Sequence, residues 1–288
     1  MMMLDFAPHD PATQRRIPDQ NPPNQNPAAR HFPVLFLSDL HLGSRACRDE
    51  ALLGFLQAHT ADVIYLVGDI IDTWTAASNQ WTANHHAILQ LLFDRAKNGT
   101  RLIYTPGNHD AFFRQYCGQR VANIDIVPHA IHRAADGRRY LVTHGDTCDV
   151  FGQRFPMLER LGAFSESVLR AMGDRFNAVM QRFGRRGWPI VDHVVNFAND
   201  VVRGLDAFDK RLVELARSHG ADGIICGHFH KPALHSDHGI PYANCGDWVE
   251  NSTALAETTS GRLLLLDWGG QAQDNRRAAP RLSIGATA

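Results

Sequence analysis

Residues 63–72 have the sequence VIYLVGDIID, an apolar run that ends in a glycine and two carboxylates. The run predicts a short buried strand over 63–67, and Gly68 allows close approach of the backbone. Asp69 then stands at the carboxyl end of the strand, where open α/β sheets place their chemistry. A carboxylate there can bridge two metal ions, because each of its oxygens can bind a different ion.

Four other short polar clusters follow apolar runs in the same way. They are Asp39-Leu40-His41, Gly107-Asn108-His109-Asp110, His144-Gly145-Asp146 and Gly227-His228-Phe229-His230. On an extended strand end, the side chains of Asp39 and His41 point to one side and form a chelate. Each cluster alone is a weak signal, but together they supply the carboxylates, amide and imidazoles of a two-metal hydrolytic site. The candidate metal ligands are Asp39, His41, Asp69, Asn108, His144, His228 and His230.

The apolar pattern predicts an α/β fold. Strands over 34–37, 63–67 and 102–105 alternate with helices over 49–59 and 83–98, and this βαβαβ order implies a parallel sheet. The pattern continues with a strand over 124–127, a hairpin of 130–133 with 139–143, a helix over 205–218 and a strand over 223–226. We expect 242–245, 253–257 and 263–268 to form a closing antiparallel set.

The chain divides into a leader, a core with an insertion, and a tail. Residues 1–31, rich in Pro, Asn and Gln, predict a disordered leader, and 269–288 predicts a similar tail. The core spans 32–268 and is interrupted by 151–203, where apolar residues spaced by three and four predict helices. This insertion carries eight arginines against five acidic residues. Two interpretations remain: helices packed on the core with a solvated basic face, or a lid that rests on an anionic membrane surface and admits an acyl chain.

Composition excludes several classes of protein. A net charge of −1 over 288 residues gives no support to a nucleic-acid partner. The five cysteines contain no C-x-x-C pair, which argues against a disulfide framework or a structural zinc site and fits a reducing cytosol. There is no apolar run of about 18 residues and no signal peptide. We therefore expect a cytoplasmic protein, peripheral on the inner face of the membrane if the insertion binds lipid.

The ordered motifs D-x-H, G-D-x-x-D, G-N-H-[DE], an isolated His and G-H-x-H resemble those of the calcineurin-like metallophosphoesterases, over residues 33–268. The resemblance implies a four-layer α/β/β/α sandwich, with the helical insertion as a lid, that holds two divalent ions. It assigns Asp39, His41, Asp69 and His230 to one ion, and Asp69, Asn108, His144 and His228 to the other. It also implies that His109 is the general acid and that Asp72 orients it.

The chemistry of these residues agrees with that implication. Two divalent ions against the charges of Asp39 and Asp69 leave a positive site that suits a phosphate or diphosphate anion. The oxygen and nitrogen ligands favour manganese, with iron or zinc as alternatives. Asp72 would hold the tautomer of His109, which would protonate the leaving oxygen.

Three further strings resemble the branch of UDP-2,3-diacylglucosamine diphosphatases: SDLHLG at 38–43, THGD at 143–146 and NCGDWVE at 244–250. That branch cleaves the diphosphate of a nucleotide-linked acylated sugar in lipid A synthesis, and it carries a helical insertion before its G-H-x-H motif. The chain departs from it at His109, where those enzymes usually have Arg. The resemblance implies a diphosphatase acting on a nucleotide-linked lipid. A soluble phosphoesterase acting on nucleotides or phosphoproteins is the alternative, followed by a non-catalytic metal-binding scaffold.

Overall fold

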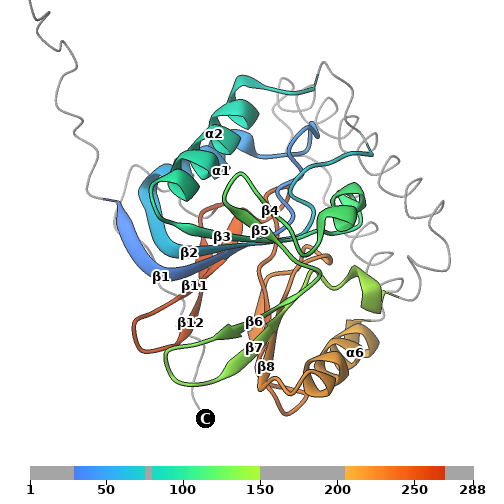
Figure 1. Ribbon diagram of the computed structural model, residues 1–288. Helices are drawn as coiled ribbons and strands as arrows, with labels where there is room; N and C mark the ends of the chain where they lie inside the picture. Colours follow the sequence, from blue (N-terminus) through green and yellow to red (C-terminus); the bar gives the residue numbers. More distant parts are fainter. Residues whose placement is uncertain (1–28, 75–79, 150–204, 270–288) are drawn as a thin grey trace, which may run out of the picture.

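The structure of the protein is a computed structural model that describes residues 29–74, 80–149 and 205–269 (Figure 1). Two sheets form its centre. The seven-stranded sheet contains β1 (Arg30–Leu37), β2 (His59–Val67), β3 (Arg101–Thr105), β4 (Arg120–Val121), β5 (Ile124–Ile126), β11 (Thr253–Glu257) and β12 (Leu263–Asp267). The five-stranded sheet contains β6 (Ala130–Arg133), β7 (Arg139–Val142), β8 (Gly223–Cys226), β9 (Ala233–His235) and β10 (Tyr242–Asn244).

The described helices cover the outer faces of the two sheets (Figure 1). Helices α1 (Asp49–Ala58) and α2 (Ala83–Lys97) pack on the seven-stranded sheet, and α6 (Leu205–Ser218) packs on the five-stranded one. Two short 3-10 helices, η2 (Ala111–Tyr116) and η3 (Asp146–Cys148), follow strand ends. The order of layers is therefore helix, sheet, sheet, helix, as the family resemblance implies.

The alternation of side chains along β1 explains how the layers are held together. Leu35 and Leu37 belong to the core beneath α1 and α2, whereas Val34 and Phe36 belong to the core between the two sheets. Successive residues of a strand point to opposite faces, so a continuous apolar run is needed where both faces are covered. The third core lies beneath α6 and includes Phe208.

The directions of the strands place the carboxyl ends of five of them, in two sheets, close together. The strands β1, β2 and β3 are parallel neighbours, and β7 and β8 are parallel neighbours in the other sheet. Each of these five strands is followed directly by one of the polar clusters. The topology therefore brings the clusters to one region of the molecule.

Most predicted elements are confirmed, and their ends differ by a few residues. All three predicted helices in the described ranges occur within one residue of their expected ends. Strand β1 begins at Arg30, inside the predicted leader, and β2 begins at His59, because the two strands pair from Arg30↔His59 onward. The predicted insertion over 151–203 lies outside the described residues, as do residues 1–28 of the leader and 270–288 of the tail.

One strand was assigned to the wrong partners. Residues 242–245 were expected in the closing antiparallel set with 253–257 and 263–268. Strand β10 instead pairs in parallel with β8 and antiparallel with β9, in the five-stranded sheet. Apolar alternation indicates that a strand is buried but does not specify the sheet to which it belongs. The short β4 and β9 carried no clear pattern and were not predicted.

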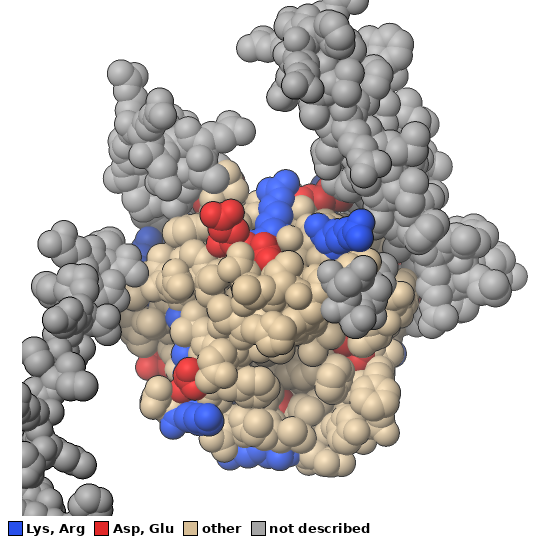
Figure 2. Space-filling model, turned by 90° about the horizontal axis from the view of Figure 1, so that it is seen from above, with Lys and Arg blue, Asp and Glu red and all other residues tan. Residues whose placement is uncertain are grey.

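The described surface agrees with the nearly neutral composition. Figure 2 shows the molecule from the side of α1 and α2, where basic and acidic side chains are interspersed among uncharged ones. Among the helices that the structure describes, none has both the length and the apolar character of a membrane span.

We predict that Phe36→Ala lowers the free energy of unfolding by about 3–5 kcal/mol. Phe36 is fully buried between the sheets and stacks on Tyr65 with ring centroids 4.9 Å apart. Urea denaturation followed by circular dichroism measures the loss. Phe112→Ala is the matched control, because Phe112 is 61% exposed and its loss should change stability by less than about 0.5 kcal/mol. Equal losses in the two variants would contradict the inter-sheet core described above.

Candidate dinuclear metal centre

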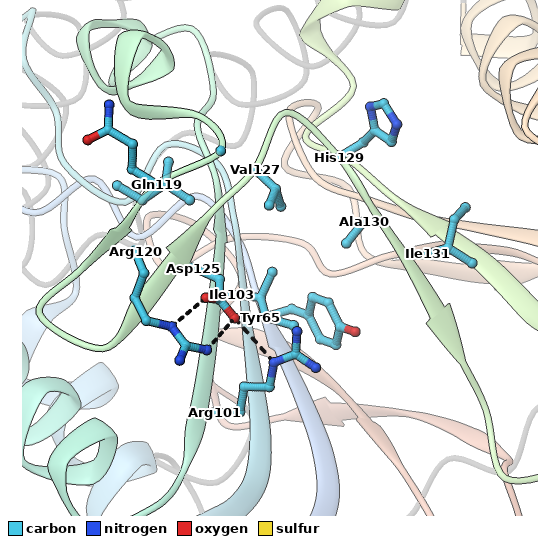
Figure 3. Close-up of a pocket in the computed structure, with 12 residues that line it drawn as sticks. Tyr65, Arg101, Ile103, Gln119, Arg120, Asp125, Val127, His129, Ala130 and Ile131 are labelled. Atoms are coloured by element: carbon cyan, nitrogen blue, oxygen red, sulfur yellow. Dashed lines mark hydrogen bonds and ion pairs between the residues drawn. The ribbon is translucent and has the colours of Figure 1, made fainter.

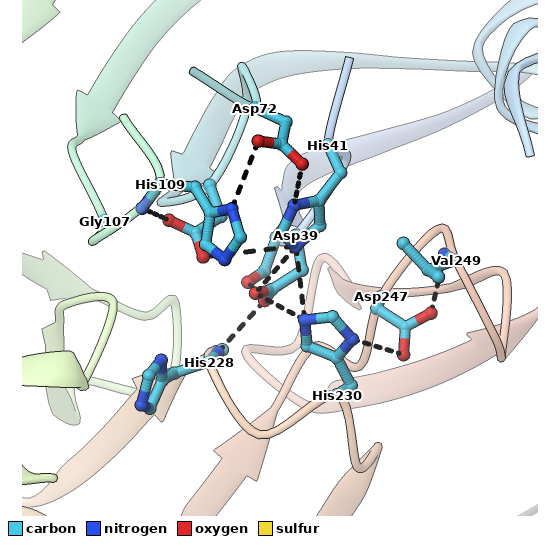
Figure 4. Close-up of polar contacts among 12 residues, drawn as sticks. Asp39, His41, Asp72, Gly107, His109, His228, His230, Asp247 and Val249 are labelled. Carbon is cyan, nitrogen blue, oxygen red and sulfur yellow. Dashed lines mark hydrogen bonds and ion pairs between the residues drawn. The ribbon is translucent and has the colours of Figure 1, made fainter. Parts of the chain in front are cut away.

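The structure brings all seven candidate metal ligands together at the carboxyl ends of the strands, where Figure 4 shows part of the group. Asp39 and His41 follow β1, Asp69 follows β2, Asn108 follows β3, His144 follows β7, and His228 and His230 follow β8. The seven-stranded sheet thus supplies both carboxylates, and the five-stranded sheet supplies three of the four imidazoles.

Five of these residues have a left-handed backbone. The φ angles are 54° for Asp39, 49° for His41, 52° for Asp69, 74° for His228 and 53° for His230. Among the described residues, only eight non-glycine residues have positive φ. A left-handed non-glycine residue costs about 1–3 kcal/mol, and such residues concentrate at functional sites.

The expectation of an extended backbone at Asp39 and His41 is therefore wrong, although both side chains do face the centre. Backbone hydrogen bonds hold the strained turn: Asp39 donates to Gly68 O at 3.0 Å and His41 donates to Asp69 O at 2.9 Å. The turn after β1 is thus fixed to the turn after β2. This tertiary bonding cannot be inferred from the local sequence.

A first group of ligand atoms is formed by Asp39, His41 and His230, which lie within 4.8 Å of one another. The Nε2 atoms of His41 and His230 are 3.2 Å apart, and His230 Nε2 is 3.2 Å from Asp39 Oδ1. Asp39 Oδ1 is buried and forms no hydrogen bond of acceptable geometry. Two imidazole nitrogens and a carboxylate oxygen thus converge on one point, an arrangement that suits a cation.

A second group is formed by Asp69, His144 and His228, also within 4.8 Å of one another. His144 Nε2 lies 3.3 Å from Asp69 Oδ2 and 3.1 Å from Asn108 Oδ1. Asp69 Oδ2 is also 4.0 Å from His41 Nε2, so this carboxylate lies between the two groups. Asp69 is therefore placed where a bridging ligand would be needed.

The ring of His144 is fixed by a backbone carbonyl. Its Nδ1 is 3.0 Å from Val67 O, which can only accept, so Nδ1 carries the proton. Nε2 therefore faces Asp69 and Asn108, and it presents its lone pair to them once the ring is neutral. This tautomer is the one that a metal ligand requires, with the second ring nitrogen hydrogen-bonded to an acceptor.

The carboxylates and histidines of the centre shift one another's pKa values. Burial opposes ionisation of Asp69, but His144, His109 and His41 outweigh it and hold the pKa of Asp69 well below its usual value. Burial likewise lowers the pKa of His230, but Asp39 and Asp247 outweigh it and raise the pKa to about 9. The pKa of His144 is also raised well above its usual value, against burial, by Asp69 and Asp39. In the metal-free protein, protons on His144 and His230 thus compensate the buried negative charges of Asp39 and Asp69. Bound divalent ions would compensate the same charges.

The backbone at Gly107 passes so close to Asp69 and His144 that no side chain fits at this position. A Cβ atom at Gly107 would clash with Asp69 Oδ1 and lie 2.7 Å from His144 Nε2. The motif glycine therefore lets the backbone pass against the two ligands. The convergent ligand atoms, the buried Asp39 oxygen and this close packing all fit a pair of divalent ions.

His109 lies beside the two groups and is held on several sides. Its Nδ1 is 3.3 Å from Asp72 Oδ1, and its ring stacks on Trp74 with centroids 3.8 Å apart. Burial lowers the pKa of His109, but the neighbouring carboxylates of Asp72 and Asp69 outweigh it, so the pKa is raised. Asp72 Oδ2 also lies 3.7 Å from His41 Nδ1, so one carboxylate orients two rings. The arrangement can hold a protonated imidazole ready to donate.

Sequence reasoning assigned no role to four residues that support the centre. Trp74 stacks on His109, Asp149 Oδ2 is 3.1 Å from His228 Nε2, and Asp247 Oδ2 is 3.6 Å from His230 Nδ1. Asp110 accepts hydrogen bonds from the backbone of Gly107 at 2.6 Å and of Ile70 at 2.7 Å. Asp110 is the last letter of the G-N-H-D motif and Asp247 lies in the NCGDWVE string, whereas Trp74 and Asp149 belong to no quoted motif.

A separate cavity of about 500 Å³ opens between β3, β5 and β6 (Figure 3). Asp125 pairs there with Arg101 at 3.3 Å and with Arg120 at 2.7 Å. None of the candidate ligands lines this cavity, so it is not part of the metal centre.

Comparison with known proteins identifies a family and several relatives. The family model described as "Calcineurin-like phosphoesterase" matches residues 32–232. A protein named UDP-2,3-diacylglucosamine hydrolase from Aromatoleum aromaticum is 30% identical over 229 residues, which cover 75% of this chain and 87% of that protein. A protein of the same name from Nitrosococcus oceani is 31% identical over 239 residues, covering 79% and 92% respectively. Among solved structures, an archaeal phosphodiesterase aligns with 81% of this chain and 98% of its own, at 12% identity and a TM-score of 0.41.

We predict that binding of Mn²⁺ to the metal-free protein releases protons at neutral pH. With a pKa of about 9, His230 is protonated in the metal-free protein, and a ring nitrogen must lose its proton to bind a metal. The apparent affinity should rise with pH through the neutral range, because fewer protons then compete with the metal for the ring nitrogens. Titration calorimetry in buffers of different ionisation enthalpy measures the protons released. His230→Ala should release fewer protons, and a heat that is independent of the buffer would contradict the prediction.

Proposed function

The chain belongs to the calcineurin-like phosphoesterase family and is a metal-dependent phosphoester hydrolase. We propose that it is a diphosphatase that acts on UDP-2,3-diacylglucosamine or a related nucleotide-linked lipid. The substrate is proposed from the names of relatives that align over more than two thirds of both chains. The observation that carries the proposed activity is the pair of ligand groups that meet at Asp69, with His109 beside them.

The family uses a dinuclear metal centre, and the proposed ligands divide between two ions. Asp39, His41, Asp69 and His230 would hold the first ion, and Asp69, Asn108, His144 and His228 would hold the second. Manganese is the proposed metal, because the donors are carboxylate, amide and imidazole without a thiolate. When bound, the two ions supply Lewis-acid activation of the phosphoryl group and of the attacking water.

His109 is the proposed general acid. Its Nδ1 faces Asp72, so its Nε2 is the atom left to give a proton to the leaving oxygen. The face of Trp74 is electron-rich and stabilises an imidazolium stacked on it. Thr73 holds the backbone of His109, since both its backbone N–H, at 3.2 Å, and its hydroxyl donate to His109 O. Asp72 and Trp74 would thus favour the protonated ring before it gives its proton to the leaving oxygen, and Thr73 would fix its backbone.

The insertion over 151–203 lies outside the described residues, and its role is part of the proposal. Its apolar residues would line a groove for an acyl chain, and its eight arginines would face lipid headgroups. Such a lid would place the protein at the cytoplasmic face of the membrane, where its substrate is anchored. The sequence pattern of the insertion is what supports this arrangement.

We predict that, with Mn²⁺ bound, kcat/KM for UDP-2,3-diacylglucosamine exceeds that for its deacylated analogue by at least about tenfold. Burial of each CH₂ group contributes about 0.8 kcal/mol, so a groove that buries even part of an acyl chain gives this ratio. A hydrolysis panel that also contains other UDP-sugars and an aryl phosphate measures it, with Asp69→Asn as the inactive control. Equal values for acylated and deacylated substrates would favour a soluble nucleotide substrate and contradict the proposal.

We predict that His109→Ala lowers kcat by about 10²–10⁴ while both ions remain bound. The loss should be smaller for an aryl phosphate, because a good leaving group needs little protonation. Steady-state kinetics on both substrates and metal analysis of the purified variant measure these effects. His129→Ala is the matched control, since His129 lines the separate cavity and should not matter for turnover. An equal loss on both substrates would assign His109 a different role.

A further inference from the structure

Asp247 lies on the connection between β10 and β11, far in sequence from the other residues of the centre, and is fully buried. Its Oδ2 is 3.6 Å from His230 Nδ1. The other nitrogen of that ring, Nε2, faces Asp39 Oδ1 at 3.2 Å. Figure 4 shows the ring of His230 between the two carboxylates. The ring is therefore contacted by a carboxylate on the side away from the other ligands.

The other oxygen of Asp247 fixes the loop that carries it. Asp247 Oδ1 accepts hydrogen bonds from the backbone N–H groups of Val249 at 2.7 Å, Glu250 at 2.5 Å and Asn251 at 3.0 Å. These bonds close a compact turn over residues 247–251. The three backbone bonds of the turn all go to Oδ1, so Oδ2 is left to face His230 and the side chain of Asn251.

Asn251 strengthens the contact with His230. Its side-chain amide donates to Asp247 Oδ2 at 2.8 Å and to the backbone oxygen of His230 at 2.6 Å. His230 is thus held at its ring by Asp247 and at its carbonyl by Asn251. These two contacts help to offset the strain of the left-handed backbone at His230.

The same turn also fixes the first carboxylate of the centre. Trp248 donates its backbone N–H to Asp39 O at 3.0 Å and accepts from Arg48 N at 2.8 Å. The indole of Trp248 is fully buried and packs on Phe55, with ring centroids 5.0 Å apart. The turn over 247–251 therefore connects Asp39 and His230, two members of the same ligand group.

We propose that Asp247 is a positioning residue for the first metal ion. Its carboxylate orients the ring of His230 from the Nδ1 side, so that Nε2 faces Asp39 and His41. Carboxylates that accept from the second nitrogen of a metal-bound histidine are a common support of metal sites. The inference rests on the proposed role of His230 as a ligand and deepens it.

Asp247→Asn tests the proposal with little change of size. The variant keeps an oxygen that can hold the turn but replaces the charge next to His230 Nδ1 with a neutral group. We expect the affinity for one of two Mn²⁺ ions to fall by about 10–100-fold, with the other ion bound as in the wild type. Titration calorimetry on the metal-free protein and electron paramagnetic resonance of the loaded protein measure affinity and stoichiometry. If Asp247→Asn does not fold, Asn251→Ala keeps the carboxylate but removes the amide that fixes its Oδ2, and the affinity for the same ion should then fall by a smaller factor; unchanged binding of both ions would contradict the proposal.

Glu257→Gln is the matched control. Glu257 is another buried carboxylate that faces a histidine, with Oε2 2.5 Å from His132 Nε2, and it accepts from the backbone of Ala135 at 2.7 Å. None of these residues belongs to the ligand groups. Glu257→Gln should lower the melting temperature but leave the binding of both ions unchanged.

The outcomes separate the inference from the proposed function. If His230→Ala loses one ion but Asp247→Asn binds both as the wild type does, the inference is wrong and the proposed ligands stand. If His230→Ala also binds both ions normally, the proposed ligand set is wrong. If Asp247→Asn weakens both ions equally and in proportion to its loss of melting temperature, Asp247 is only a structural residue.

Discussion

The burial of the Asp69 carboxylate is the constraint on which the centre depends. Taking one charge out of water costs several kcal/mol unless partners compensate it. Its Oδ1 accepts from the backbone of His109 at 2.8 Å, and its Oδ2 lies 3.3 Å from His144 and 4.0 Å from His41. Each of these partners comes from a different strand end. The position of Asp69 therefore requires the ends of β1, β3 and β7 to meet beside the end of β2, and it requires positive charge around the carboxylate.

Asp72 links the proposed ligands to the proposed acid. It lies three residues after Asp69, and its two oxygens face His109 at 3.3 Å and His41 at 3.7 Å. Its backbone N–H donates to Leu42 O at 2.9 Å, which ties it to the turn after β1. A displacement of this turn would move a ligand and the acid together. The spacing of the two carboxylates in the G-D-x-x-D motif thus couples binding of the metal to delivery of the proton.

The sequence predicts the ligands better than it predicts their support. The ligands follow strands as short recognisable clusters, so strand direction alone brings them together. Asp247 and Asp149 stand far from the histidines that they contact, and nothing in local spacing marks them as partners. The left-handed turn at Asp39 also depends on bonds to Gly68 and Asp69, which belong to another strand. The wrong assignment of 242–245 has the same origin, because the choice between two buried sheets is made by tertiary packing.

The division of the ligands between the sheets gives the metal a structural consequence as well as a chemical one. Asp39, His41, Asp69 and Asn108 belong to the seven-stranded sheet, and His144, His228 and His230 belong to the five-stranded sheet. Each ion would therefore be bound from both sheets at once. The apolar layer that contains Phe36 and Val142 holds the sheets together without metal. Bound ions add to that layer by mass action, about 2.7 kcal/mol when the free metal is 100 times its dissociation constant. The five left-handed residues are ligands of this centre, so metal binding can offset their backbone strain. The inter-sheet core then has to hold the two groups of strand ends close enough for each ion to contact both sheets.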